Sequence, residues 1–309
     1  MVAAARHTAI TALIFITAIG NVHCQSKFDA FLTPADSFNQ QRFNYTIATE
    51  AALTTGILSG LYFLWYADYP QSSFHFVNDN RDWLQMDKLG HGMTAYYVGV
   101  AGINLMKWTG MERKKAIWYG GLQGWIFLMA VEMFDGFSAE WGFSPGDFYA
   151  NTLGAGLAMG QEALWEEQRI MMKFSFSGSP YRTENPAVLG TSGWQSWLKD
   201  YNGQTYWLSA SPGAFMSNAI WPDWLCLSAG YSGMGMATGD PRNQAANPAY
   251  AHLTRQRQYY FSLDIDLTKI PVKNRFLRNV LHTVNFVKIP LPAFEVQQNG
   301  NTQWHWMHF

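Results

Sequence analysis

The stretch that decides the fold of this chain is residues 87–106, which read DKLGHGMTAYYVGVAGINLM. Charged residues open the stretch and a long apolar run follows, without the alternation that marks a strand. Three similar apolar stretches lie nearby, at residues 51–67, 116–131 and 148–161. The sequence therefore predicts a helical first half built from about four apolar helices.

These predicted helices are marginal as membrane spans, because a bilayer crossing needs roughly 20 apolar residues, with a range of about 17 to 25. Residues 51–67 and 89–106 reach the lower limit, and residues 148–161 fall short. If all four crossed, the basic loop 107–115 would lie outside and the aspartate-rich loop 68–88 inside, against the positive-inside rule. We therefore predict a membrane-associated bundle instead of an ordinary four-span protein. The conflict with the positive-inside rule also disappears if residues 51–67 do not cross the membrane.

The second half changes to a period of two and predicts a small antiparallel sheet, which makes the fold class α+β. On the fourth predicted strand, Tyr259, Phe261 and Leu263 alternate with Tyr260 and Asp264, so one face of the sheet should meet apolar matter. The predicted strands are residues 173–177, 205–209, 224–231, 259–267, 284–289 and 303–309. His305 and His308, three apart on the last strand, should face opposite sides and receive no role.

Composition restricts the function. The chain has 309 residues, 48% of them hydrophobic and only 14% charged, which excludes intrinsic disorder. Lysine and arginine number 21 against 22 acidic residues, so there is no basic excess for a nucleic acid partner. The sequence alone does not identify a substrate.

The N-terminus has the features of an export signal, with Arg6 before an apolar run over residues 9–20. We predict cleavage before Gln25; the alternative is that Cys24 is the lipidated cysteine of a lipoprotein signal, although His23 stands where such signals carry a small residue. Cys226 is predicted to be a buried hydrophobic residue. The predicted organisation is a signal peptide (1–24), an extended segment (25–46), a helical domain (47–168) and a β-rich region (169–309). The predicted location is the periplasm or outer membrane of a bacterial envelope.

Polar residues that border or enter the apolar helices form the candidate site. A charge in such surroundings is costly unless it is paired, so we expect these side chains to converge on one another or on a ligand. The candidate residues are Asp87, Lys88, His91, Glu132, Asp135, Asp147 and Asn151.

Structural roles compete with functional ones at these positions. The sequence Ser144-Pro145-Gly146-Asp147 has the form of a capping box, and Asp87 would favour a helix start. A lone buried histidine such as His91 is more often a hydrogen-bonded core residue than a ligand. One histidine among carboxylates does not favour zinc and leaves Mg²⁺ or Ca²⁺ as options, so no cofactor is predicted.

The order of these motifs resembles a known family. Asp87-Lys88-x-Gly90-His91, then Glu132-x-x-Asp135-Gly136-Phe137-Ser138, then Asp147-x-x-x-Asn151-x-x-Gly154 is similar to the predicted periplasmic YfiM-like family, a domain of unknown function. More remotely, D-K-x-x-H followed by an acid and D-x-x-x-N-x-x-G is similar to the VanZ-like membrane proteins. The nearer resemblance implies an envelope location and leaves the activity open.

Three functions remain as hypotheses. The first is a structural or binding component of the envelope, without catalysis, whose polar cluster joins the helices or holds a lipid headgroup or ion; its partners would be membrane lipid and another envelope protein. The absence of a recognised nucleophile motif favours this hypothesis over an enzyme. The second is a membrane-interface enzyme acting on a lipid or cell-wall precursor with His91 as general base. The third is a small outer-membrane barrel with a helical plug.

Overall fold

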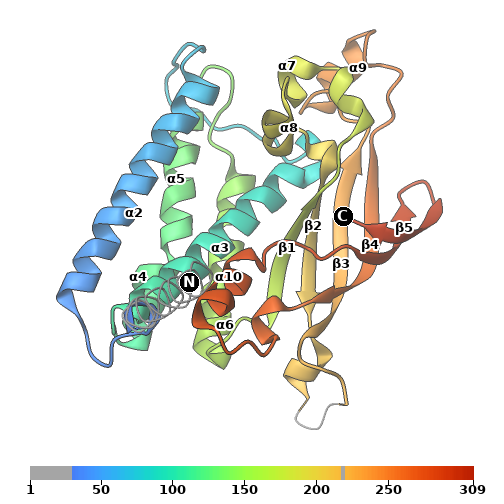
Figure 1. The fold of residues 1–309 in the computed structure, drawn as a ribbon. Helices are drawn as coiled ribbons and strands as arrows, with labels where there is room; N and C mark the ends of the chain where they lie inside the picture. The colour runs from blue at the N-terminus through green and yellow to red at the C-terminus, as the bar shows by residue number, and fades with distance from the viewer. Residues whose placement is uncertain (1–29, 217–219) are drawn as a thin grey trace, which may run out of the picture.

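The computed structural model describes residues 30–216 and 220–309. Helices fill one side of the molecule and a sheet fills the other (Figure 1), which confirms the predicted α+β class. The helices of the first side are α2 (Gln40–Leu61), α3 (Met86–Trp108), α4 (Arg113–Gly121), α5 (Gln123–Gly136) and α6 (Pro145–Trp165). The predicted signal peptide, including Cys24 and the cleavage site, lies outside the described residues.

The long helix α3 lies between the other helices and the sheet (Figure 1). Glycines allow the helix backbones to approach closely: a Cβ atom built on Gly154 of α6 would lie 2.0 Å from the carbonyl oxygen of Gly92 on α3. A Cβ atom on Gly102 of α3 would likewise lie 2.4 Å from the carbonyl oxygen of Gly120 on α4. Small residues therefore set the spacing of this bundle.

The prediction of about four membrane-associated helices is too high. Among the described residues, only the segment Gln40–Tyr66 is long and apolar enough to cross a membrane, and its apolar window is not buried by the rest of the protein. This segment is α2 continued by a turn of π-helix, η1 (Tyr62–Tyr66). The helix over residues 89–106 instead belongs to the core, since Tyr96, Ile103 and Met106 are buried.

The other helix predictions need smaller corrections. The predicted helix over residues 116–131 is two helices, because α4 ends at Gly121 and α5 begins at Gln123. Residues 51–67 are the second part of a helix that begins at Gln40, where Asn39 caps it by accepting the backbone N–H of Arg42. The four-span pattern therefore does not apply to this chain.

The sheet has six antiparallel strands in the order β1 to β6, with β1 and β6 at its edges. Their bounds are β1 (Ile170–Phe176), β2 (Gln204–Ala210), β3 (Leu225–Met234), β4 (Gln256–Ile265), β5 (Leu291–Gln297) and β6 (Thr302–His308). The predicted strand over residues 284–289 is wrong: helix α10 (Arg275–Val284) ends there, and the fifth strand follows at Leu291. Isolated pairing of Val287 with Phe174 is all that remains of this predicted strand.

Short helices complete the second half. They are η3 (Pro180–Thr183), α7 (Pro186–Leu189), α8 (Gly193–Lys199), η4 (Tyr201–Gly203), η5 (Pro212–Phe215), α9 (Pro241–Ala246) and η6 (Leu267–Lys269). Helices α7, α8 and α9 lie at one end of the sheet, and α10 lies beside α3 and β1 (Figure 1). The connections between strands thus bring extra elements next to the helical half.

The sheet buries its polar face. Lys173 and Asp264 are completely buried and form an ion pair at 3.0 Å, and Ser209 donates to Asp264 at 2.9 Å. The alternation on β4 is as predicted, but Tyr259, Phe261 and Leu263 on the apolar face are exposed. Cys226 is buried on β3, as expected.

The prediction for His305 and His308 is wrong. Their rings lie 5.0 Å apart, so they share one side of β6. The reason is a bulge between β5 and β6: Ala293 pairs with His305 and Leu291 pairs with His308, so β6 carries one additional residue. His305 contacts the Glu295 carboxylate at 2.6 Å.

Candidate functional site

Three helices bring the centre of the polar cluster together. His91 lies on α3, Glu132 on α5 and Asn151 on α6. His91 Nδ1 lies 3.2 Å from Asn151 Oδ1 and 3.7 Å from Glu132 Oε1. On its other side, His91 Nε2 lies 3.9 Å from Asp87 Oδ1, one turn earlier on the same helix. The expected convergence is therefore present in the structure.

Lys88 occupies the acidic end of this cluster. Its ammonium group donates to Asp79 Oδ2 at 2.6 Å and to Asp147 Oδ2 at 2.9 Å. It also lies 3.5 Å from Asp87 Oδ2 and within reach of Ser144 Oγ at 3.4 Å. One lysine thus connects the loop before α3 with the start of α6.

The start of α6 is a capping box that is shared between two helices. Ser144 is the N-cap, and its hydroxyl accepts the backbone N–H of Asp147 at 3.1 Å, as predicted. The backbone N–H of Ser144 donates to Glu132 Oε2 on α5 at 3.0 Å, a role that the capping interpretation gave to Asp147. The Asp147 carboxylate is therefore available to Lys88.

A left-handed turn precedes the start of α3. Trp83, Leu84 and Gln85 all have positive φ angles, between 47° and 66°, which is unfavourable for residues with side chains. Contacts from the sheet side fix this turn: the Trp83 N–H donates to Gly239 O, and Tyr231 donates its hydroxyl proton to Leu84 O. Backbone strain of this kind occurs at functional sites, and here it directly precedes the helix turn that carries Asp87 and Lys88.

Asp135 lies at the edge of the cluster, where its hydrogen-bond partner is a tyrosine. Its carboxylate accepts a hydrogen bond from the Tyr66 hydroxyl at 2.7 Å, at the end of the apolar segment Gln40–Tyr66. Asp87 accepts another tyrosine hydroxyl, from Tyr201, at 2.8 Å. Tyr201 belongs to η4 in the second half, so the cluster is completed by both halves of the chain.

The sequence reasoning missed Asp79, Tyr66 and Tyr201. Asp79 lies in the aspartate-rich loop over residues 68–88, and a loop position has no periodicity that predicts the direction of its side chain. The two tyrosines lie far from the motifs in sequence. Their roles follow from tertiary contacts alone.

Burial changes the acidity of the cluster. It raises the pKa of Glu132 to about 8, that of Asp135 to about 7 and that of Asp147 to about 6. Burial alone would lower the pKa of His91, but Asp87, Asp147 and Glu132 together raise it. Burial alone would raise the pKa of Asp87, but the neighbouring His91 and Lys88 outweigh this effect and lower it.

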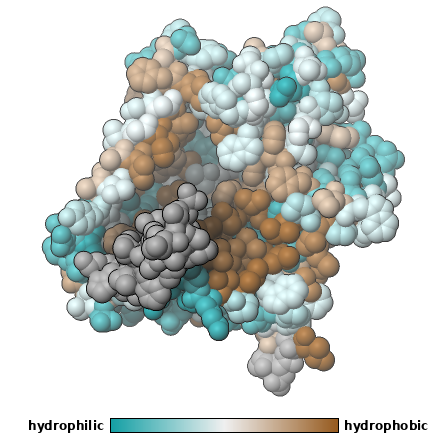
Figure 2. All heavy atoms as spheres, in the orientation of Figure 1, coloured by the Kyte–Doolittle hydropathy of each residue, from teal (hydrophilic) through white to brown (hydrophobic). Residues whose placement is uncertain are grey.

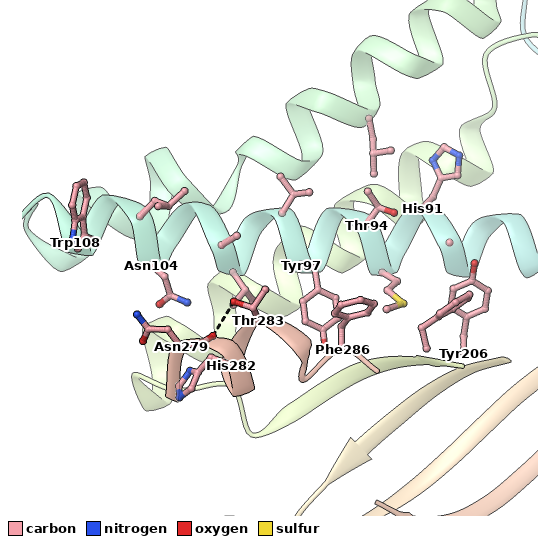
Figure 3. Close-up of a pocket in the computed structure, with 18 of the residues that line it drawn as sticks. His91, Thr94, Tyr97, Asn104, Trp108, Tyr206, Asn279, His282, Thr283 and Phe286 are labelled. Atoms are coloured by element: carbon pink, nitrogen blue, oxygen red, sulfur yellow. Dashed lines mark hydrogen bonds between the residues drawn. The ribbon is translucent and has the colours of Figure 1, made fainter. Parts of the chain in front are cut away.

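A large groove opens beside the cluster. It has a volume of about 1380 Å³, and Asp87 and His91 form part of its lining. Helix α3 contributes more residues to its lining than any other element. In Figure 3, Tyr97 and Asn104 of α3 lie opposite Asn279 and Thr283 of α10, whereas His91 projects from the other side of α3. The cluster is therefore accessible from this groove.

Part of the chain matches a known protein family. Residues 75–162 match the family described as "Predicted periplasmic lipoprotein (DUF2279)", over less than a third of the chain. The matched segment contains every candidate residue named from the sequence. No curated protein and no solved structure matches the chain.

The match supports part of what the resemblance implied. It supports a predicted periplasmic lipoprotein family of unknown function, and it agrees with an exported protein of the bacterial cell envelope, as predicted. The description of the matching family carries neither the YfiM-like name nor a similarity to VanZ-like proteins.

Proposed function

We propose that this protein is a membrane-anchored envelope protein that binds an anionic phospholipid in the groove between α3 and α10. The observation that carries the proposal is the groove itself, with its apolar walls and its two polar ends. This proposal develops the hypothesis of a binding component and commits it to one ligand.

The walls of the groove suit an acyl chain. Met93, Tyr97, Val98 and Leu105 of α3 and Phe286 after α10 line its length. The lining residues of α3 run from Asp87 to Trp108, and an α-helix of that length extends about 30 Å. An acyl chain needs about half of that distance, because the hydrocarbon core of a whole bilayer is about 30 Å thick.

The end of the groove far from His91 is cationic. Arg275 and Arg278 of α10 line it together with Lys107 of α3. In the described residues, no carboxylate lies within 4.0 Å of the Arg278 guanidinium group, whereas Lys107 is paired with Glu162 at 2.8 Å. Arginine binds phosphate through several donors in a planar arrangement, so Arg278 is the preferred headgroup contact.

The surface around the groove is suited to a membrane. Helix α10 places Arg275 and Arg278 at the groove and leaves Leu277, Val280 and Val284 exposed, an amphipathic pattern typical of helices at a lipid interface. Figure 2 shows hydrophobic residues gathered over α10 and the neighbouring strands, with a hollow between them and α2. The exposed row Leu208, Phe261, Phe294 and Trp304 crosses the sheet through paired positions.

Two further features support membrane anchoring. The apolar window of α2 is unburied, and Leu53, Ile57 and Phe63 are exposed along the segment Gln40–Tyr66. The matching family is described as a lipoprotein family, which favours Cys24 as a lipidated residue over cleavage before Gln25. Mass spectrometry of the N-terminal peptide distinguishes a diacylated Cys24 from a chain that begins at Gln25.

The lining of the groove supports binding over catalysis. Most of it is apolar, and of the seven candidate residues only Asp87 and His91 belong to it. An apolar groove with a few polar groups is typical of a ligand-binding site. The enzyme hypothesis therefore has less support than the binding hypothesis.

A fluorescent phosphatidylglycerol tests the proposal in detergent micelles. Ala101 is exposed on α3 and lines the groove, so Ala101→Trp should fill the groove and weaken lipid binding at least tenfold without disturbing the core. Ala163→Trp is the matched control, because Ala163 is exposed on α6 and outside the groove lining. Equal binding by both variants and the wild type would contradict the proposal.

A further inference from the structure

Three polar atoms of the cluster have no hydrogen-bond partner although they are buried. They are Glu132 Oε1, Asp147 Oδ1 and Asn151 Nδ2, on side chains of residues that are 1%, 3% and 0% exposed. A buried carboxylate oxygen without a partner costs roughly 1 to 3 kcal/mol or more. Such atoms in one cluster indicate a ligand that the protein side chains do not replace.

We propose that Asp87, His91 and Asp147 bind a divalent metal ion. Each of the three residues offers one ligand atom, and these atoms all lie within 4.8 Å of one another. Two ligands on opposite sides of an ion at about 2.1 Å each are about 4.2 Å apart, so small side-chain rotations complete the site. This proposal is independent of the lipid proposal.

The existing hydrogen bonds leave these ligand atoms available. Lys88 occupies Asp147 Oδ2, and the buried Asp147 Oδ1 has no hydrogen-bond partner. Tyr201 donates to Asp87 Oδ1, which fixes the carboxylate, and this oxygen, 3.9 Å from His91 Nε2, keeps a second lone pair for an ion. Asn151 Oδ1 accepts a hydrogen bond from His91 Nδ1, so Nε2 is the ring nitrogen that faces Asp87. A second contact that orients a metal-binding histidine in this way is typical of metal sites.

The charge of the cluster also favours a cation. Asp79, Asp87, Glu132 and Asp147 surround Lys88 and His91, and Asp135 lies on the next turn of α5 from Glu132. The carboxylates therefore outnumber the two basic side chains, and a divalent ion complements this excess of acidic groups.

The donor set selects the class of metal. One imidazole nitrogen with two carboxylates suits Mn²⁺ or Zn²⁺ better than Ca²⁺ or Mg²⁺, which prefer oxygen ligands alone. This preference differs from the sequence-based option of Mg²⁺ or Ca²⁺. The ion has a route to the site, because the side chains of Asp87 and His91 are 26% and 15% exposed and line the groove.

Titration of the purified full chain with Mn²⁺ in detergent tests the site. After treatment with a chelator, the wild type should bind one Mn²⁺ per chain, and Asp147→Asn and His91→Gln should each weaken binding at least tenfold. The matched control is His305→Gln, because His305 also contacts a buried carboxylate but has no second acid in the site. Binding that is undetectable in the wild type at millimolar Mn²⁺, or unchanged in Asp147→Asn, would overturn the proposal.

A measurement on the wild type avoids the case in which a variant fails to fold. Pulsed electron paramagnetic resonance of the Mn²⁺ complex should show coupling to a directly bound imidazole nitrogen. A spectrum with water and carboxylate ligands alone would exclude His91 as a ligand and overturn the proposed set. Ala101→Trp should retain Mn²⁺ binding, so failure of the lipid proposal and failure of the metal proposal can be told apart.

Discussion

Glu132 of α5 accepts the backbone N–H of Ser144, the N-cap residue of α6, at 3.0 Å. In an ordinary capping box, the acid three residues after the cap makes this contact. Here that acid is Asp147, and the substitution by Glu132 releases it for Lys88 at 2.9 Å. One hydrogen bond between two helices therefore both starts α6 and builds the polar cluster.

The first prediction concerns the pH dependence of Glu132. Burial raises its pKa to about 8, whereas the unfolded chain has its ordinary value near 4.5. Between these values the folded protein holds a proton that the unfolded chain has lost, so the free energy of unfolding falls as the pH rises from about 4.5 to 8. Glu132→Gln should reduce this fall.

Urea unfolding at pH 5 and pH 8 in the presence of a chelator measures this effect. Each unit of pKa shift is worth about 1.4 kcal/mol, so we expect the variant to lose roughly 1 to 4 kcal/mol less than the wild type between the two pH values. Gln keeps an acceptor for the Ser144 N–H. An identical decrease in both proteins would show that Glu132 is ionised in the folded state at both pH values.

The second prediction concerns Lys88. Lys88→Met should destabilise the protein by roughly 3 to 5 kcal/mol, because it removes the cation shared by Asp79 and Asp147 and leaves buried charge uncompensated. Lys114→Met, at an exposed position of α4, should change stability by less than about 0.5 kcal/mol. Thermal or urea unfolding measures both; equal effects would contradict the proposed importance of the cluster.

The third prediction concerns two glycines of α6. Gly154→Ala should destabilise the protein strongly, by several kcal/mol, because the new Cβ would lie 2.0 Å from Gly92 O. Gly156→Ala has no atom within 4 Å of the new Cβ and should stabilise the helix by up to about 1 kcal/mol. Opposite changes in unfolding midpoint are expected, and a stable Gly154→Ala variant would mean that α3 and α6 are not in close contact.

The fourth prediction concerns the headgroup. Arg278→Glu should weaken binding of phosphatidylglycerol about tenfold, which corresponds to about 1.4 kcal/mol. Binding of an uncharged acyl glycerol should change little, because the walls of the groove are untouched. Arg182→Glu, at an exposed position outside the groove lining, is the control. If both variants lose affinity equally, the effect is one of overall charge and not of the groove.

Local patterns predicted much of the fold. The apolar run over residues 89–106 lies inside α3, and five predicted strands overlap observed ones. The prediction failed at residues 284–289, where the apolar residues belong to the end of α10 and a following turn. Short apolar runs do not distinguish a strand from part of a helix, and here the true strand contains Pro292, which weakened its signal.

Whether a face of the sheet is buried or exposed was harder to predict than the alternation of its residues. Tyr259 and Phe261 alternate with Tyr260 as expected, but the apolar side is the exposed one. Likewise, the sequence named the residues that surround His91 but not Asp79 or Tyr201, whose approach depends on the left-handed turn and on packing between the two halves. Contacts between distant segments leave no local pattern to read.

The most direct test of lipid binding in the groove is native mass spectrometry of the wild type and of Ala101→Trp. Both proteins are released from membrane particles that contain anionic lipid and are prepared without detergent. We predict that the wild type retains one phospholipid per chain, identified by fragmentation as an anionic species, and that Ala101→Trp carries none. A wild-type protein that emerges without lipid, or a variant that retains the same lipid at the same occupancy, would contradict the account.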